Sequence, residues 1–493
     1  MSRDHPGGES TNCAKRPGRL LIRADDPSLT PYAGLAISGE LARDLRLIEL
    51  VDAELAAARR VAPVKQRRRG LTPGALTVAI AEAQLVGAEC FDDIELVRAD
   101  RALAPWRAVA RTPSAPTARQ LAYRFRPTHI RAIERAVARC GNELDRKLGR
   151  DATAAVTFDL DATETKVYGR RKHGAGRSRH GYLAYNSYIV TWAERGRALT
   201  SELKGGNQAR IKATQSGQML ARGERLLPAE HGQITVRGDN GFCSLELMSD
   251  CRKRAMRFSF SATRTSVMWQ KLAEIPEDAW SDATCIQAAQ VAELQFTPEG
   301  WKHEPLRLIV RRVPVTAEEL RQGSPKARRR KTIPPEQLQM VLDGQLDSTY
   351  AYSFIVTDIP ASEKTTTEVE HFHRQRAHVE ERFKDVKLGQ ALRHLPSRDL
   401  NANRLWLCCA LLALNICAWV CDITPAAGAS GTAPERTPLR RHAKTLRHLL
   451  FCVPARIIRT ARQTIMRLPD GFLHFEIFNA TYHAALALAL PGP

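Results

Sequence analysis

The alternation of hydrophobic and polar residues predicts two strands that end near acidic side chains. Residues 156–161 alternate apolar with polar side chains, which puts Asp159 and Asp161 on one face of a strand. Residues 233–238 form a second strand candidate, which runs into Asp239 within an Asp-Asn-Gly turn signal. Because ligand sites of α/β sheets gather at the carboxyl ends of strands, these Asp side chains are candidates for a shared site.

Helical periodicity dominates the two ends of the chain. Between residues 30 and 149 we expect several short helices joined by basic loops, an arrangement typical of helix-turn-helix regions and also of small bundles without DNA function. The stretch Leu405–Cys421 is mostly apolar but short for a membrane span. Since the chain is strongly basic and has no second hydrophobic segment, we interpret this stretch as a buried core helix.

A third acidic motif lies on a predicted helix. His373, Arg376, Glu380 and Lys387 follow one another at helical spacings, so their side chains share one helix face. A carboxylate flanked by cations suits a metal-bound phosphate site, in which the acid holds the ion and the cations bind the phosphodiester. Taken alone, the same motif is typical of a solvated amphipathic helix with ordinary ion pairs.

The three acidic motifs together indicate metal-dependent chemistry at phosphorus. Each Asp taken separately is more often a turn or capping residue. Two strand-borne Asp residues and one helix-borne Glu are, however, a ligand set for two Mg²⁺ (or Mn²⁺) ions about 4 Å apart, which suits in-line displacement. We therefore expect Asp161, Asp239 and Glu380 to be metal ligands and catalytic residues.

The order of these motifs resembles that of the DDE transposases of bacterial insertion sequences. It is similar to the branch whose third motif reads Tyr-x2-Arg-x3-Glu-x6-Lys, and within that branch to the insertion-sequence 1380 group. The resemblance extends from about residue 30 to about residue 425. His373 departs from the pattern, because the family usually has Tyr there, although a His can still donate to a phosphate. The segments that carry the resemblance are Asp159-Leu160-Asp161-Ala162-Thr163, Gly181-Tyr182, Asp239-Asn240-Gly241-Phe242, and the helix with Arg376, Val379-Glu380-Glu381-Arg382-Phe383-Lys384 and Lys387.

The resemblance implies an α/β fold with a ribonuclease H-like catalytic core, a β-rich insertion, a helical N-terminal DNA-binding region and a helical C-terminal tail. It aligns Asp161 with a metal ligand, which leaves Asp159 as a group that supports the ligands from outside. It also implies that Arg376 and Lys387 bind phosphate oxygens near the cut. The expected division is a disordered basic tail (1–29), the DNA-binding region (30–149), the first part of the core (150–262), the insertion with a mobile basic loop (263–362), the second part of the core (363–422) and a linker with a basic helical region (423–493).

Charge and cysteine content agree with a DNA-handling protein of the cytosol. The formal net charge of +21 favours a polyanionic partner. Arg170, Arg171 and Lys172 follow the first Asp motif and are candidates to contact the DNA backbone near the scissile phosphate, with a solvated hairpin turn as the alternative. The 11 cysteines are scattered without metal-type spacing, and the N-terminus does not look like a signal peptide, so we expect reduced thiols.

The expected function is therefore that of a DNA transposase that binds the terminal inverted repeats of an insertion sequence. It would cleave the ends and join the 3′-OH to target DNA by two-metal phosphoryl transfer. The expected partner is double-stranded DNA, at the transposon ends and at the target, with a homodimer in the synaptic complex, no membrane and a nucleoid-associated location in the bacterial cytoplasm. Two alternatives are a structure-specific nuclease of the same fold and a non-catalytic, domesticated DNA-binding regulator.

Overall fold

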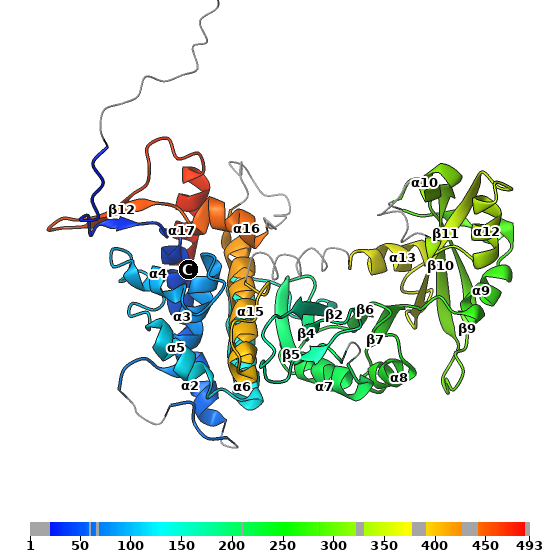
Figure 1. Ribbon diagram of the computed structural model, residues 1–493, viewed down its shortest axis with the longest axis horizontal. Coiled ribbons are helices and arrows are strands. Elements are labelled where there is room, and N and C mark those ends of the chain that lie inside the picture. Colours follow the sequence, from blue (N-terminus) through cyan, green and yellow to red (C-terminus); the bar gives the residue numbers. More distant parts are fainter. Residues whose placement is uncertain are drawn as a thin grey trace, which may run out of the picture.

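A large mixed sheet forms the centre of this α/β protein. The computed structural model describes residues 20–58, 61–65, 69–208, 211–284, 286–321, 330–376, 391–425 and 442–488. Figure 1 shows the helical N-terminal and C-terminal parts at one end of the ten-stranded sheet and the strands β9–β11 at the other. The strands in sheet order are β3 (Gly176–Arg177), β4 (Leu183–Trp192), β2 (Val156–Lys166), β6 (Ile234–Gly238), β7 (Arg257–Ser261), β11 (Ser348–Thr357), β10 (Leu306–Thr316), β9 (Gln290–Phe296) and β8 (Ser281–Asp282), with β5 (Arg197–Gly205) paired to β4.

Along the chain, the first part of the sheet consists of strands β2 to β5, a helix, a strand, a second helix and a further strand. β2 pairs antiparallel with β4, and β4 pairs antiparallel with β5. Helix α7 (Ala213–Glu224) then leads to β6, and helix α8 (Leu245–Lys253) leads to β7. β6 lies parallel to both β2 and β7. The sheet is therefore mixed, with its parallel strands directly beside β2.

The predicted alternation along β2 is confirmed. Val156, Phe158 and Leu160 are at most 1% exposed and belong to one hydrophobic cluster with residues of α7 and α8. Burying apolar side chains of this size contributes roughly 1.5–3 kcal/mol each. This burial fixes which face of β2 packs against the helices, so Asp159 and Asp161 are left on the opposite face.

The strands expected for the insertion also form, and they join the same sheet. β11 pairs antiparallel with β7, from Ile355 opposite Ser261 to Thr357 opposite Ser259. Side chains of β9, β10 and β11 belong to the same hydrophobic cluster as β2. The predicted basic loop, residues 326–331, lies mostly outside the described residues. The helices of this part are α9 (Ser266–Ala273), η1 (Glu277–Ala279), α10 (Ala317–Arg321), α12 (Pro335–Leu342) and α13 (Thr366–Arg374).

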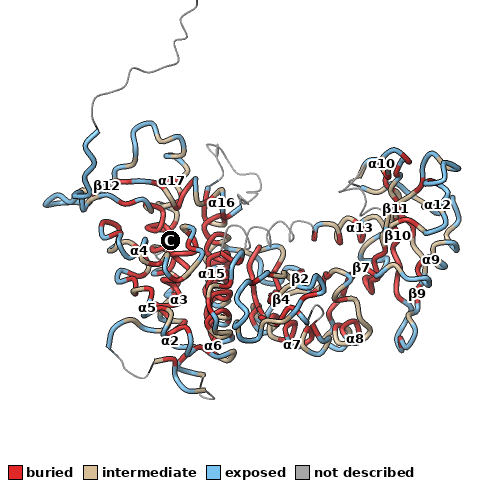
Figure 2. The backbone as a smooth tube through the Cα atoms, in the orientation of Figure 1, coloured by how far each residue is buried: buried red, intermediate tan, exposed pale blue. Residues whose placement is uncertain are grey.

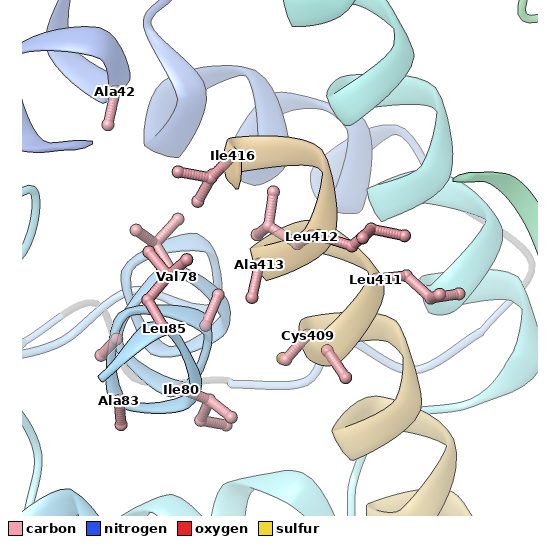
Figure 3. Packing of buried hydrophobic residues seen from close by; sticks show 14 of the residues in the cluster. Ala42, Val78, Ile80, Ala83, Leu85, Cys409, Leu411, Leu412, Ala413 and Ile416 are labelled. Atoms are coloured by element: carbon pink, nitrogen blue, oxygen red, sulfur yellow. The ribbon is translucent and has the colours of Figure 1, made fainter. Parts of the chain in front are cut away.

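Helix α15 (Leu400–Ile423) confirms the predicted buried core helix. It is the one helix in the described ranges that is long and apolar enough to cross a membrane, yet 89% of its most apolar window is buried. Figure 2 shows it as a buried column, and Figure 3 shows its side chains packed against α3. The helices around it are α1 (Leu35–Asp44), α2 (Leu47–Ala57), α3 (Pro73–Leu85), α4 (Ile94–Ala99), α5 (Ala115–Ala122) and α6 (Pro127–Lys147).

Polar groups fasten α15 and α6 to the outer edge of β5. Asn415, the one amide inside the apolar stretch, accepts from Ala198 N at 2.8 Å and donates to Ala198 O at 2.9 Å. The buried guanidinium of Arg197 donates to Asp145 of α6 and to Asp422 of α15. These contacts satisfy strand groups that lack a neighbouring strand and fix the helical region against the sheet.

The C-terminal part differs from the expected helical tail. β1 (Leu29–Thr30) pairs with β12 (Ala455–Arg459), which pairs with β13 (Thr464–Arg467), so the two terminal parts share a small sheet. Residue 29, placed in the disordered tail from the sequence, is therefore a strand residue. The approach is close, because a Cβ at Gly34 would lie 1.9 Å from Leu450 O. The remaining elements are α16 (Ala443–Leu446), the π-helical turn η2 (Arg447–Phe451) and α17 (Phe475–Ala487).

Candidate active site

Two parallel strands bring Asp161 and Asp239 together. The register of β2 and β6 places Leu160 opposite Gly238, and each of these residues directly precedes one of the two Asp residues. Asp161 lies within β2, whereas Asp239 follows β6 and begins a turn. In that turn Asp239 Oδ1 accepts a hydrogen bond from Gly241 N at 2.8 Å. Strand pairing and the turn together therefore place the carboxylates of Asp161 and Asp239 next to each other on the sheet.

A guanidinium lies between the two carboxylates. Arg376 donates from Nη2 to Asp161 Oδ1 at 3.0 Å, and the same nitrogen lies 4.0 Å from Asp239 Oδ2. The side chains of Arg376 and Asp161 are 9% and 11% exposed, whereas that of Asp239 is 42% exposed. The structure therefore brings three of the predicted site residues together and leaves Asp239 open to solvent.

A second, fully buried ion pair joins β2 to β6. Arg237 donates from Nε and Nη2 to the two carboxylate oxygens of Asp159, each at 2.7 Å. Its remaining terminal nitrogen donates to Phe372 O at 2.5 Å, and its guanidinium lies 4.7 Å from the centre of the Phe372 ring. Arg237 therefore occupies both carboxylate oxygens of Asp159 and joins α13 to the sheet through Phe372.

Helix α13 presents Arg376 to the carboxylates. It begins with a capping box, in which Thr365 and Glu368 each accept a hydrogen bond from the other's backbone N–H. The helix ends at Arg374, and Arg376 lies in the following turn, where its backbone N donates to His373 O at 3.1 Å. The side chain of Arg376 therefore leaves the helix end in the direction of β2.

His373 lies in the interior between α13 and β7. Its Nδ1 lies 2.9 Å from Ser259 Oγ and its Nε2 lies 2.9 Å from Ser261 Oγ. Burial, together with the neighbouring guanidinium of Arg376, lowers the pKa of His373 to about 3, so the ring is neutral. One ring nitrogen then donates and the other accepts. This placement differs from the expectation that His373 meets the DNA, because both of its polar atoms are occupied inside the protein.

The other two residues of the predicted helix face, Glu380 and Lys387, lie outside the described residues. Of the four side chains predicted to share one helix face, only His373 and Arg376 can therefore be compared with the structure. These two diverge, because Arg376 reaches Asp161 whereas His373 is held by β7.

The basic loop after β2 has one anchored and two exposed cations. Lys172 is half-buried and donates to the backbone carbonyls of Leu395 and Ser397, the latter at 3.1 Å. Burial lowers the pKa of Lys172. Arg170 and Arg171 are exposed. The loop is therefore fixed to the segment before α15 by its lysine, while its two arginines face solvent.

A cavity of about 260 Å³ lies beside Asp239. Ala162 and Glu164 contribute to its wall, and because they alternate with Asp161 along β2, the cavity is on the opposite face of this strand from Asp161. Glu164 accepts a hydrogen bond from the hydroxyl of Tyr182, the residue of the Gly-Tyr segment. The complete lining is Ala162, Glu164, Arg179, Asn186, Tyr188, Ile211, Asp239, Asn240, Gly241 and Phe242.

The interior residues that bind Asp159 and His373 were not identified from the sequence. These residues are Arg237, Ser259 and Ser261. Arg237 is the one charged side chain in strand β6, which is a signal for a buried ion pair. Ser259 and Ser261 alternate with Phe258 and Phe260 along β7, which places both hydroxyls on one face. Neither signal identifies the partner, because Asp159 and His373 come from distant parts of the sequence.

The donor chemistry of the site fits a hard divalent cation. Asp161 and Asp239 offer carboxylate oxygens, the ligands that Mg²⁺ and Mn²⁺ prefer. Within the described part of the chain, no group of three His, Cys, Asp or Glu side chains could hold a metal ion. The third predicted ligand, Glu380, is outside that part. Two carboxylates beside a cationic side chain suit a site at which divalent metal ions act on a phosphodiester.

The chain belongs to the transposase DDE domain group 1 family, whose model matches residues 15–323 and 342–489. It is a DNA transposase, a metal-dependent enzyme of DNA cleavage and strand transfer, and enzymes of this family use divalent metal ions. No curated protein matches the sequence. Among solved structures, the chain is similar to a piggyBac transposase in a synaptic complex with hairpin DNA, at 10% identity and a TM-score of 0.35, over 95% of this chain and 86% of the other. Similarity at this level does not establish a shared fold.

Proposed function

We propose that Asp161, Asp239 and Glu380 bind the catalytic metal ions, two Mg²⁺ or Mn²⁺. The observation that carries this proposal is the convergence of Asp161 and Asp239, from two parallel strands, on the single guanidinium of Arg376. These carboxylates would hold the ions, which would supply activation of water for cutting the DNA end and of the freed 3′-OH for joining to target DNA. The Asp239 carboxylate is 42% exposed, so it is accessible to an ion or a phosphate from solvent.

The cations around the site would bind the DNA backbone. In this proposal Arg376 and Lys387 contact phosphate oxygens near the cut, while the exposed Arg170 and Arg171 contact the flanking backbone. Lys172 serves a different purpose, since its ammonium group is bound to carbonyls of the protein and positions this loop. The net charge of +21 supports binding of a polyanion.

At the level of the mobile element, the proposed substrates are the terminal inverted repeats of an insertion sequence of the 1380 group. The proposed catalytic core is ribonuclease H-like, formed by β5, β4, β2, β6 and β7, which is supported by the order of strands and helices along the chain. A homodimer would hold two ends in one synaptic complex, in the bacterial cytoplasm at the nucleoid.

Cleavage of terminal DNA by single-residue variants tests the proposal. The substrate is a duplex with the inverted repeat taken from the DNA that flanks the gene. Asp161→Ala, Asp239→Ala and Glu380→Ala should each abolish cleavage in Mg²⁺, through loss of several kcal/mol of charge stabilisation, while DNA binding persists.

Two matched controls accompany these variants. Glu381→Ala, a change of the neighbouring acid, and Asp278→Ala, a change of an exposed acid in η1, should both cut normally. Cleavage that survives in Glu380→Ala but is lost in Glu381→Ala would show that the wrong neighbour was assigned. Cleavage of the repeat without any joining to target DNA would favour a nuclease instead.

A further inference from the structure

The Asp161 and Asp239 carboxylates already share a cation, and this cation belongs to the protein. Arg376 Nη2 lies 3.0 Å from one carboxylate and 4.0 Å from the other. Asp161 is almost entirely buried, and a buried carboxylate without a partner is costly. Two neighbouring carboxylates also repel each other. The positive charge of Arg376 offsets part of both costs.

We infer that Arg376 is a resident counter-cation that a divalent metal ion must displace before the site becomes active. This inference rests on the proposed metal site and adds a mode of regulation to it. A divalent ion binds carboxylate oxygens at about 2.0–2.6 Å. Arg376 Nη2 donates to Asp161 Oδ1 and lies 4.0 Å from Asp239 Oδ2, so an ion held by both carboxylates would compete with this guanidinium.

The backbone around Arg376 is anchored, so displacement would move its side chain rather than the helix. Its backbone N donates to His373 O, and His373 is held by the two β7 serines. The preceding Phe372 carbonyl is held by Arg237. A guanidinium released from Asp161 would therefore stay beside the site.

A released Arg376 would then bind the DNA phosphate. Metal loading would in this way convert Arg376 from a partner of the carboxylates into a partner of the substrate. The order of events that follows is metal ion first and productive phosphate contact second. Without a metal ion, the guanidinium remains on the carboxylates and is not available to the scissile phosphate.

The affinity of the DNA-free full-length protein for Mn²⁺, measured by electron paramagnetic resonance of the free ion, tests this competition. Arg376→Gln should bind Mn²⁺ about tenfold more tightly than the unchanged protein, because a charge-assisted hydrogen bond no longer opposes the ion. Arg376→Lys, which keeps the charge but loses the planar fork, should give a smaller gain. Unchanged or weaker Mn²⁺ binding by Arg376→Gln would overturn the inference.

Two controls separate competition from other effects. Arg374→Gln removes a nearby cation that pairs with Glu370 at 3.6 Å and should leave Mn²⁺ affinity unchanged. The gain in Arg376→Gln should persist in about 1 M KCl, where the effect of a distant charge is screened. If the gain in Mn²⁺ affinity disappears in about 1 M KCl, it comes from the overall electrostatic potential of the protein, and direct competition by Arg376 is overturned.

Failure of the metal site itself has a different signature. Asp161→Asn should lose Mn²⁺ binding. If it binds Mn²⁺ as the unchanged protein does, the metal site is not at Asp161 and the proposed function fails together with the inference. Thermal unfolding confirms that each variant is folded, and Arg376→Lys carries the test if Arg376→Gln does not fold.

Discussion

Replacement of His373 tests whether this residue is part of the interior rather than of a DNA-binding face. His373→Ala removes a ring that is 8% exposed and leaves the hydroxyls of Ser259 and Ser261 without their partner. A cavity of ring size costs roughly 2–5 kcal/mol, and each buried polar group left unpaired costs roughly 1–3 kcal/mol. With partial relaxation, we expect the free energy of unfolding to fall by about 3–5 kcal/mol in urea titrations.

The pH dependence of the unfolding free energy provides an independent test of the burial of His373. The pKa of His373 is near its ordinary value of 6.5 when the chain is unfolded, and burial lowers this pKa to about 3 in the folded protein. The stability that the neutral ring contributes is therefore fully present above pH 6.5 and is lost as the pH falls towards 3. The loss is about 1.4 kcal/mol per pH unit. His373→Gln has no such proton, so its unfolding free energy should fall less steeply between about pH 6.5 and about pH 5.

Tyrosine at this position provides the sharpest comparison. Its larger ring overpacks the site, at roughly 1–3 kcal/mol, and its single hydroxyl reaches one serine at most. His373→Tyr should therefore be destabilised, and Ser259→Ala or Ser261→Ala in the same chain should restore part of the loss. His371→Ala, in the same helix, should change stability by about 0.5 kcal/mol or less. A stable His373→Tyr, or a His373 that titrates near pH 6.5 in the folded protein, would refute the reasoning.

Three further predictions concern the buried charges and the DNA-binding surface. Asp145→Ala leaves the 4%-exposed side chain of Arg197 without one of its partners and should lower the unfolding free energy by about 3–5 kcal/mol in denaturant titrations. Burial raises the pKa of Glu134 to about 7, so its contribution to stability is lost as the pH rises from about 4.5 through 7, and Glu134→Gln should reduce that fall in calorimetry. Binding to terminal DNA should weaken with salt at about −0.9 in log K against log[salt] per phosphate contact, and changing both Arg170 and Arg171 to Ala should reduce the slope by about 2. A flat salt response would contradict a DNA-backbone role for these arginines.

Local patterns were sufficient to predict strand β2, the turn after β6 and helix α15. The alternation along β2 depends only on neighbouring residues and on the preference of apolar side chains for the interior, and the turn after β6 is encoded by Asp239-Asn240-Gly241. The length and apolar character of α15 similarly identified a buried helix. Parallel pairing of β2 with β6 then brings Asp161 and Asp239 together.

Contacts between distant segments could not be predicted from such patterns. The helix-face argument for His373 and Arg376 assumed that one helix continues through both, whereas α13 ends at Arg374. The inward position of His373 depends on Ser259 and Ser261, which lie more than a hundred residues earlier in the chain. The pairing of β1 with β12 likewise involves strands too short to show a period of their own.

The most direct test of the central claim, that Asp161 is a ligand of the catalytic metal ion, is a change of metal preference. Asp161→Cys replaces a carboxylate by a softer thiolate ligand, which disfavours Mg²⁺ more than Mn²⁺. Cleavage of terminal DNA by this variant should be lost in Mg²⁺ and partly restored in Mn²⁺, whereas Asp161→Ala should stay inactive in both and the unchanged protein should cut in both. Normal cleavage by Asp161→Cys in Mg²⁺, or equal rescue of Asp161→Ala by Mn²⁺, would contradict the account.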